Sequence, residues 1–197
     1  HSIRRRQRQM CIRDRLAPAI HFPSKSKEWT AAVDYTKNKF AKNPGNVSKE
    51  RVYPITHKEA KEWFEQFLTY RFYEFGIYEY AIVKESLFLN HSVLSPLINS
   101  GLIAPKEIIA SALSFSEKEG IPINSTEGFV RQIIGWREFI RGMYLCKGRF
   151  ARTKNFWGFT RKIPLSFYEG TTGIEPLDET IKKVLDTGYC NHIERLM

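Results

Sequence analysis

The stretch 124–146, NSTEGFVRQIIGWREFIRGMYLC, decides the fold class of this 197-residue chain. Asn124 and Glu127 have the spacing of a capping box, in which each side chain bonds the other residue's backbone N–H, so the pair predicts a helix start. At about 100° per residue, the apolar side chains gather on one face, formed by Phe129, Ile133, Trp136, Ile140, Met143 and Tyr144. We therefore expect the longest helix of the protein here, ending near Cys146.

The sequence on either side predicts further helices and no strands. A second capping box, Thr56 with Glu59, opens a helix that we expect to end at Gly76. Pro105 suits the first turn of another helix, which closes at Gly120. Shorter helices are expected over residues 78–88, 92–100 and 178–186, and from 189 onward. Because no alternating strand pattern competes with these signals, the predicted fold is all-α.

The chain divides into three segments. Residues 1–15 carry six arginines and one aspartate without apolar periodicity, so we interpret them as a disordered or artefactual basic tail that packs against nothing. A genuine basic arm for nucleic acid is the alternative. Residues 16–55 are rich in lysine, proline and asparagine and are expected to form an extended lead-in or linker. Residues 56–197 form the helical domain. The chain stops inside an amphipathic pattern without a cap, so we interpret it as a fragment cut at both ends.

Composition excludes several classes of protein. Hydrophobic residues make up 42% and aromatic residues 14%, which is enough for a packed core and excludes a wholly disordered chain. The three cysteines are odd in number and lack C-x-x-C spacing, so we expect no disulfide scaffold, no metal site and a reducing cytoplasm. No apolar run approaches the ~18–20 residues of a membrane span. The net charge of +10 favours a polyanionic partner.

One cation interrupts the apolar face of the long predicted helix. Arg137 falls within that face, where a guanidinium is costly unless it meets an anion. Two interpretations stay open: a buried ion pair with a carboxylate, or a bound phosphate, whose oxygens suit the planar fork of arginine. Trp136, on the same face, is more often a core residue than a platform for base stacking.

Two other stretches could bind anions. In His91–Pro96, HSVLSP, two serine hydroxyls stand at a predicted helix start, although serine is also an ordinary N-cap. Residues 147–162 begin KGRFARTKNFW and interleave six cations with aromatic side chains, without a carboxylate. This pattern suits a nucleic-acid backbone with bases stacked on the rings, and it suits a solvated charged loop equally well. Motifs of zinc hydrolases, serine hydrolases and nucleotide kinases do not occur.

Taken in order, these segments resemble the photolyase/cryptochrome family, in its helical FAD-binding domain. The run FVRQIIGWREFIRG at 129–142 is similar to the R-Q-I-[LI]-G-W-R-E-[FY] helix of the prokaryotic photolyase-related, (6-4) photolyase-like branch. HSVLSP at 91–96 resembles the family's T-S-x-L-S segment, and residues 170–189 keep its G-x-T-G…D…G-W spacing. NHIERLM at 191–197 resembles the H-H-I-Q-R-L-M run of the bacterial branch. The resemblance covers roughly residues 30–197.

The resemblance implies FAD as the cofactor and UV-damaged DNA as the partner. By the family's positions, the residues at the flavin would be Tyr78, Ser92, Leu94, Ser95 and Arg137. A place at the flavin would explain why Arg137 interrupts an apolar face. Iron–sulfur members of the branch have a cysteine near Pro176, where this chain has none, so the resemblance predicts no cluster here.

The resemblance also assigns residues to the DNA side of the pocket. Gln132 and Trp136 would line the cavity for the flipped-out lesion. His192 matches the histidine proposed to protonate a (6-4) lesion, and Asn191 replaces the histidine before it, which puts proton relay there in doubt. The basic stretch would contact DNA through Lys147, Arg149, Arg152, Lys154 and Trp157.

The implied function is light-driven repair of pyrimidine dimers by a monomeric, cytoplasmic DNA photolyase-like lyase, with the (6-4) type favoured and the flavin carrying the photochemistry. The fragment alone is expected to be inactive, because in the family the segment after Met197 supplies further residues around the flavin. Two alternatives stay open. A cryptochrome-type blue-light photoreceptor would use the same pocket for signalling, and a helical nucleic-acid-binding module would use the basic stretch without flavin.

Overall fold

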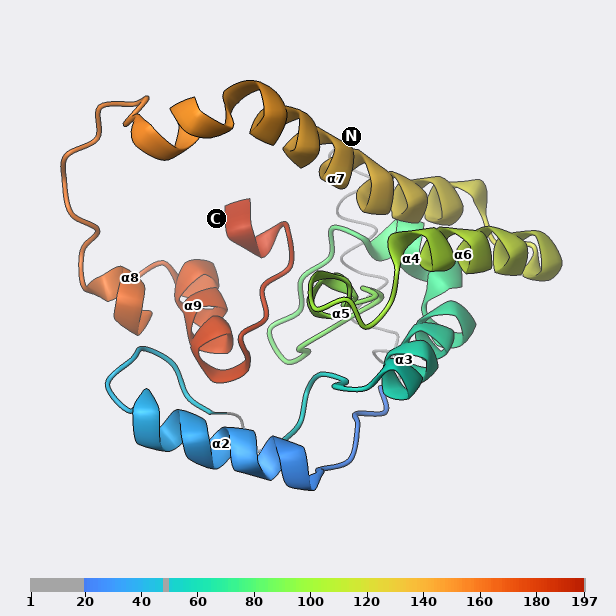
Figure 1. Ribbon diagram of the computed structural model, residues 1–197, viewed down its shortest axis with the longest axis horizontal. Coiled ribbons are helices and arrows are strands. Elements are labelled where there is room, and N and C mark those ends of the chain that lie inside the picture. The colour runs from blue at the N-terminus through green and yellow to red at the C-terminus, as the bar shows by residue number, and fades with distance from the viewer. Residues whose placement is uncertain (1–19, 48–49, 197) are drawn as a thin grey trace.

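The computed structural model describes residues 20–47 and 50–196, and within them the chain is helical without strands (Figure 1). The elements are α2 (Lys27–Lys39), α3 (His57–Tyr70), α4 (Phe72–Tyr78), α5 (Ser95–Asn99), α6 (Pro105–Glu119), α7 (Ile123–Thr153), α8 (Ser166–Glu169), α9 (Glu175–Thr187) and the 3-10 turn η1 (Glu194–Leu196). The predicted all-α fold class is confirmed. The basic tail, residues 1–15, lies outside the described residues. None of the helices described combines the length and apolarity that a membrane crossing needs.

The core lies where α3, α4 and the first half of α7 meet, with α6 packed against α7. Phe129 of α7 is at its centre. The centroid of its ring lies 5.0 Å from that of Phe67, 5.4 Å from Phe72 and 5.8 Å from Phe75. Edge-to-face and tilted contacts of this kind stabilise aromatic clusters beyond the area they bury. This cluster therefore joins three helices that are separate in sequence.

Gly76 lies inside α4 and does not end a helix, so the predicted helix from Thr56 to Gly76 is wrong in its second part. The Thr56 cap itself is confirmed, because its hydroxyl accepts the Glu59 N–H at 3.2 Å. The helix breaks at Arg71, and α4 begins at the next residue. A Cβ on Gly76 would lie 2.6 Å from the backbone of Asn124 and Ser125. Glycine therefore permits the close approach of α4 to the start of α7.

Helix α7 differs from its prediction at both ends. It begins at Ile123, and Pro122 rather than Asn124 stands at its N-cap, without a side-chain bond. It runs to Thr153 instead of Cys146, because no proline interrupts it and the backbone becomes extended only at Lys154. Its 31 residues span roughly 46 Å at 1.5 Å per residue. Residues 147–153, the first part of the basic stretch, are consequently the last part of this helix.

The expectation of an extended lead-in over residues 16–55 is wrong at its centre, where α2 forms. The hydroxyl of Ser26 caps the helix by accepting the Trp29 N–H at 3.2 Å. No side chain of α2 is fully buried, which is why the sequence shows little apolar periodicity there. After α2 the chain docks on α9, since Asn46 donates through its backbone N–H to Leu185 O and through its side chain to Asp186, both at 2.7 Å.

The remaining short helices are partly confirmed. The helix closed at Gly120 forms as α6, and residues 178–186 lie within α9. The helix expected over 78–88 is absent, that over 92–100 shrinks to α5, and only the turn η1 forms after 189. Between α4 and α5 the backbone is irregular, and side chains of other segments bond its carbonyl groups. Trp63 Nε1 donates to Ser92 O, and Arg71 Nη1 donates to His91 O, both at 2.9 Å.

Candidate functional site

Glu79 is the centre of a polar cluster between α4, α7 and the C-terminal segment. Its buried carboxylate accepts a hydrogen bond from Gln132 Nε2 at 3.3 Å. A Cβ on Gly128 would lie 3.1 Å from the same carboxylate, so the backbone of α7 packs directly against it. Tyr80 hydrogen-bonds this carboxylate, which raises the pKa of the phenol. The ring of Tyr80 lies edge-on to the imidazole of His192, with centroids 5.5 Å apart.

The cluster brings Gln132 and His192, predicted from two different motifs, to one place in the fold. His192 is exposed on its outer side. Partial burial lowers the pKa of His192 below the ordinary histidine value, and the charge of Glu79 opposes that effect. The lowered pKa reduces the protonated fraction at neutral pH, and it makes the imidazolium a stronger acid whenever it forms.

Asn191 caps the turn that carries His192. Its side-chain oxygen accepts the N–H groups of Ile193 at 3.0 Å and Glu194 at 2.9 Å, and Glu194 accepts the Asn191 N–H at 2.9 Å. This reciprocal pattern is a capping box. Glu194 is buried and forms an ion pair with Lys183 of α9. In this geometry Asn191 holds His192 in place, and its amide carries no titratable proton for a relay.

The predicted phosphate segment forms a turn from His91 to Ser95. Ser92 is half-buried, Leu94 is buried and Ser95 is exposed as the first residue of α5. Neither serine hydroxyl makes a hydrogen bond to another described residue. Val93 has φ 54°, a left-handed conformation that is strained for a β-branched residue. Tyr78, the other predicted flavin contact, is buried at the end of α4.

Arg71 was missed in the sequence and lies against this turn. The side chain is completely buried, and its Nε and Nη2 atoms have no hydrogen-bond partner among the described residues. A buried cation bonded to a turn that carries two free hydroxyls fits a group that carries phosphates, such as FAD. A signal was available in the sequence, because Arg71 stands one helical turn from both Phe67 and Phe75, within an apolar face.

Arg137 and Trp136 lie where α7 leaves the core. Only Phe129 and Ile133 of the predicted apolar face are buried, so the expectation of a continuous buried face is wrong beyond Ile133. Arg137 is half-buried, its Nη1 donates to Ile133 O at 3.2 Å, and it makes no ion pair within the described chain. Trp136 is exposed and stacks on Phe139, with centroids 5.9 Å apart. No described contact joins Arg137 to the His91–Ser95 turn.

The basic stretch is exposed along its whole length. All the DNA-side residues predicted from it are exposed, namely Lys147, Arg149, Arg152, Lys154 and Trp157. Its aromatic rings touch in series: Phe156 lies 5.0 Å from Trp157, and Trp157 lies 6.5 Å from Phe159 with their planes only 17° apart. No acidic residue occurs between Glu138 and Glu169. The arrangement combines exposed cations with exposed flat rings.

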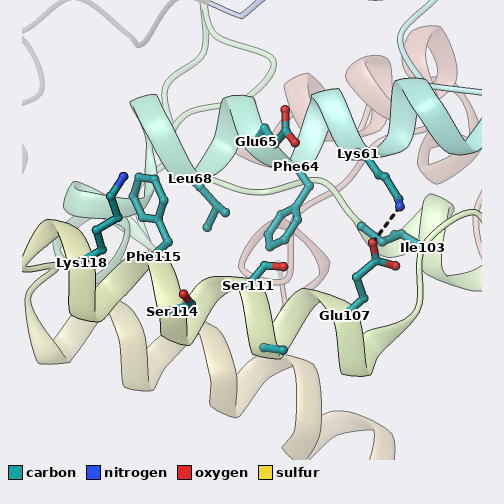
Figure 2. A pocket seen from close by; sticks show the side chains of 11 residues that line it. Lys61, Phe64, Glu65, Leu68, Ile103, Glu107, Ser111, Ser114, Phe115 and Lys118 are labelled. Carbon is teal, nitrogen blue, oxygen red and sulfur yellow. Dashed lines mark ion pairs between the residues drawn. The ribbon is translucent and has the colours of Figure 1, made fainter.

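A groove of about 630 Å³ lies elsewhere, between α3 and α6 (Figure 2). Figure 2 shows Phe64 of α3 and Phe115 of α6 in it, with the Lys61–Glu107 ion pair at one end, 3.2 Å long. None of the predicted site residues lines this groove, so its size does not mark the chemistry. Within the described residues, no group of three histidine, cysteine or acidic side chains could hold a metal ion.

Comparison with known proteins finds similar sequences, although no family model matches the chain. Over 190 residues, 96% of its length, the chain is 30% identical to the (6-4) photolyase of Agrobacterium fabrum. The chain is thus similar to part of a photolyase over nearly its whole length. It is also 22% identical over 187 residues to the deoxyribodipyrimidine photo-lyase of Buchnera aphidicola. The chain spans 37% of the length of each of those two proteins.

A shorter relative has no described function. The chain is 36% identical over 116 residues to an uncharacterized protein of Acanthamoeba polyphaga mimivirus, and covers 86% of that protein. The two chains belong to one family.

Proposed function

We propose that this chain is part of an FAD-dependent, DNA photolyase-like protein that repairs pyrimidine dimers in light, of the (6-4) type. The observation that carries the proposal is the cluster around Glu79, where Gln132 and His192 come together from separate motifs. Base-directed chemistry needs an extruded nucleotide held by polar and aromatic groups. Gln132, Tyr80 and the exposed side of His192 provide such groups at one edge of the helical core.

The cofactor would be held by residues of α4, the His91–Ser95 turn and α7. Ser92 and Ser95 would bind its phosphates, while Tyr78, Leu94 and Arg137 would contact the flavin and its ribityl chain. When bound, the flavin supplies the light-driven electron transfer. The free serine hydroxyls and the Nε and Nη2 atoms of Arg71 support this assignment, because these polar groups have no hydrogen-bond partner in the described chain.

The proton would come from His192. Its lowered pKa makes the imidazolium a ready donor, and the Asn191–Glu194 capping box together with Tyr80 would hold the ring in position. Gln132 would hydrogen-bond the extruded base, and Trp136 would line the lesion cavity. Asn191 enters the proposal as a positioning residue only.

Exposed cations would neutralise DNA phosphates while the rings beside them stack on bases. Lys147, Arg149, Arg152, Lys154 and Trp157 are the residues proposed for this contact, in a protein that acts as a monomer in the cytoplasm. Affinity would then fall steeply as salt concentration rises.

The test is light-dependent repair of an oligonucleotide carrying a (6-4) photoproduct, assayed with the gene product at full length and with this chain alone. We expect repair by the full-length protein after reduction of bound FAD. His192→Ala should abolish repair and leave flavin absorbance intact, whereas His21→Ala, which alters an exposed imidazole, should change neither.

Three results would contradict the proposal. Flavin binding with a light response but no repair would favour a photoreceptor of the cryptochrome type. DNA binding without any flavin would favour a helical nucleic-acid-binding module. Unchanged repair by His192→Ala would remove this residue from the chemistry and with it the (6-4) assignment.

A further inference from the structure

Arg71 is a buried charge that the fold leaves without a counter-ion. It lies at the break between α3 and α4, with its guanidinium 5.5 Å from the ring centre of Trp63 and 5.7 Å from that of Phe67. Its single hydrogen bond runs from Nη1 to His91 O at 2.9 Å. Nε and Nη2 have no partner, and no described carboxylate acts on the charge. Such a group is costly unless something else compensates for it.

A second buried arginine shows how this fold otherwise treats the same side chain. Arg51 forms an ion pair with Glu59 and donates to Ser24 O at 2.8 Å and Tyr53 O at 3.2 Å. Every nitrogen of its guanidinium therefore has a partner. The difference indicates that the partner of Arg71 is not part of the described chain.

The position of Arg71 indicates where that partner would bind. The carbonyl that Arg71 holds belongs to His91, the residue before Ser92. Trp63, whose ring lies under the guanidinium, donates through Nε1 to Ser92 O at 2.9 Å. Two direct bonds thus tie the cation and its aromatic neighbour to the turn that carries the free hydroxyls of Ser92 and Ser95. The same turn contains the strained Val93.

We propose that Arg71 is the residue that selects a phosphate-bearing ligand at the His91–Ser95 turn, with the Ser92 and Ser95 hydroxyls as the direct contacts. The proposal rests on the proposed function in one respect, namely that the diphosphate of FAD is the expected ligand. Burial lowers the pKa of Arg71 to about 10, so the guanidinium stays charged at neutral pH. Because buried charges are poorly screened, this one acts across the turn on an anion bound outside it.

A series of three flavins tests the charge directly. FAD, FMN and riboflavin share one ring system and carry two, one and no phosphates. We would titrate each into the 197-residue chain and into its Arg71→Met and Arg71→Lys variants, following flavin fluorescence. Arg71→Met should weaken FAD binding about tenfold or more, the size expected for a charge-assisted contact. It should leave riboflavin binding unchanged, and Arg71→Lys should recover part of the FAD affinity because it keeps the charge without the fork.

A double variant, Ser92→Ala with Ser95→Ala, keeps Arg71 and removes the direct contacts. It should lose the preference for FAD over riboflavin while its circular dichroism matches that of the parent. This variant decides the question if Arg71→Met fails to fold. Equal FAD affinity in Arg71→Met and the parent, or an equal loss for FAD and riboflavin, would overturn the proposal.

Inorganic pyrophosphate separates this proposal from the proposed function. We expect it to move the backbone NMR signals of residues 92–95 in the parent chain and not in Arg71→Met. If pyrophosphate moves these signals only in the parent chain while neither the parent nor Arg71→Met binds FAD, the phosphate site is supported and the proposed flavin function is contradicted. If pyrophosphate moves none of these signals in the parent, Arg71 does not select phosphate, whatever FAD does. A short undamaged oligonucleotide that moves them in preference to FAD would identify nucleic acid as the ligand and overturn the assignment to FAD.

Discussion

The two halves of α7 carry similar apolar side chains and have opposite surroundings. In the first half, Phe129 is 1% exposed and Ile133 is 7% exposed. Beyond Ile133, Trp136 is 63% exposed and Tyr144 is 67% exposed. Figure 1 shows the reason, since α4 and α6 lie along the first half while the second half extends away from them. Apolar periodicity thus identifies a face that can be buried, and neighbouring helices decide whether it is.

The proposed chemistry lies at the boundary between these halves. Gln132 stands beside the last buried residue, Ile133, and reaches the Glu79 cluster on the core side. Trp136 and Arg137 follow immediately on the exposed side. A site at such a boundary has rigid support from the core and open access for a large partner such as DNA.

The largest effect should come from the centre of the packed half. Phe129→Ala should destabilise the protein by about 3–5 kcal/mol, because it leaves a cavity among the rings of α3 and α4. Phe139→Ala, in the exposed half, is the matched control and should change stability by less than about 0.5 kcal/mol. Urea unfolding of both variants measures the difference, and equal losses would contradict the division of α7.

The second-largest effect is expected from acid, which should destabilise the packed region. Burial lowers the pKa of His91 to about 4, against about 6.5 in the unfolded chain. The unfolded state therefore binds more protons between these values, so stability is complete above pH 6.5 and falls by about 3 kcal/mol as the pH drops to 4. Unfolding free energies across this range measure the slope. His91→Gln should flatten it, and a slope unchanged in that variant would show that other groups cause the acid loss.

Alanine substitutions at two glycines test the same division of α7, because one glycine packs against the start of α7 and the other lies in its exposed part. Gly76→Ala should cost about 1–3 kcal/mol, because the added Cβ would lie 2.6 Å from the start of α7. Gly142→Ala, in the exposed half, meets nothing within 4 Å. It should stabilise the helix by about 0.5–1 kcal/mol. Thermal unfolding would show shifts of opposite sign, and a stable Gly76→Ala variant would contradict the close approach of α4 to α7.

The smallest effect on stability is expected at Trp136. Trp136→Ala should change the unfolding free energy by less than about 0.5 kcal/mol, since the ring contacts mainly Phe139 and solvent. Its affinity for DNA with an unstacked base should still fall, by about 1–3 kcal/mol if the ring stacks on that base. Fluorescence anisotropy measures this, and a loss of stability without a loss of affinity would assign Trp136 to the core instead.

Much of the local structure could be predicted because its causes are local. The Thr56 cap, the αL glycine after α6 and the 178–186 part of α9 depend on neighbours within one helical turn. The predictions that were wrong concern positions whose structure depends on contacts with residues distant in the sequence. Gly76 reads as a helix end, yet it is a contact point for Asn124 and Ser125. Helix α2 lacked an apolar signal because its side chains stay largely exposed.

The sequence by itself determined the all-α class, the order of the motifs and the residue types that are proposed to recognise phosphate and bases. Those properties depend on the residue types and their spacing along the chain, which the sequence gives directly. Only the tertiary structure decided that Arg71 is buried without a counter-ion, that Glu79 joins Gln132 and His192, and that α7 has buried residues only as far as Ile133. Burial and the pairing of charges depend on which distant segments meet, and that follows from packing of the whole chain.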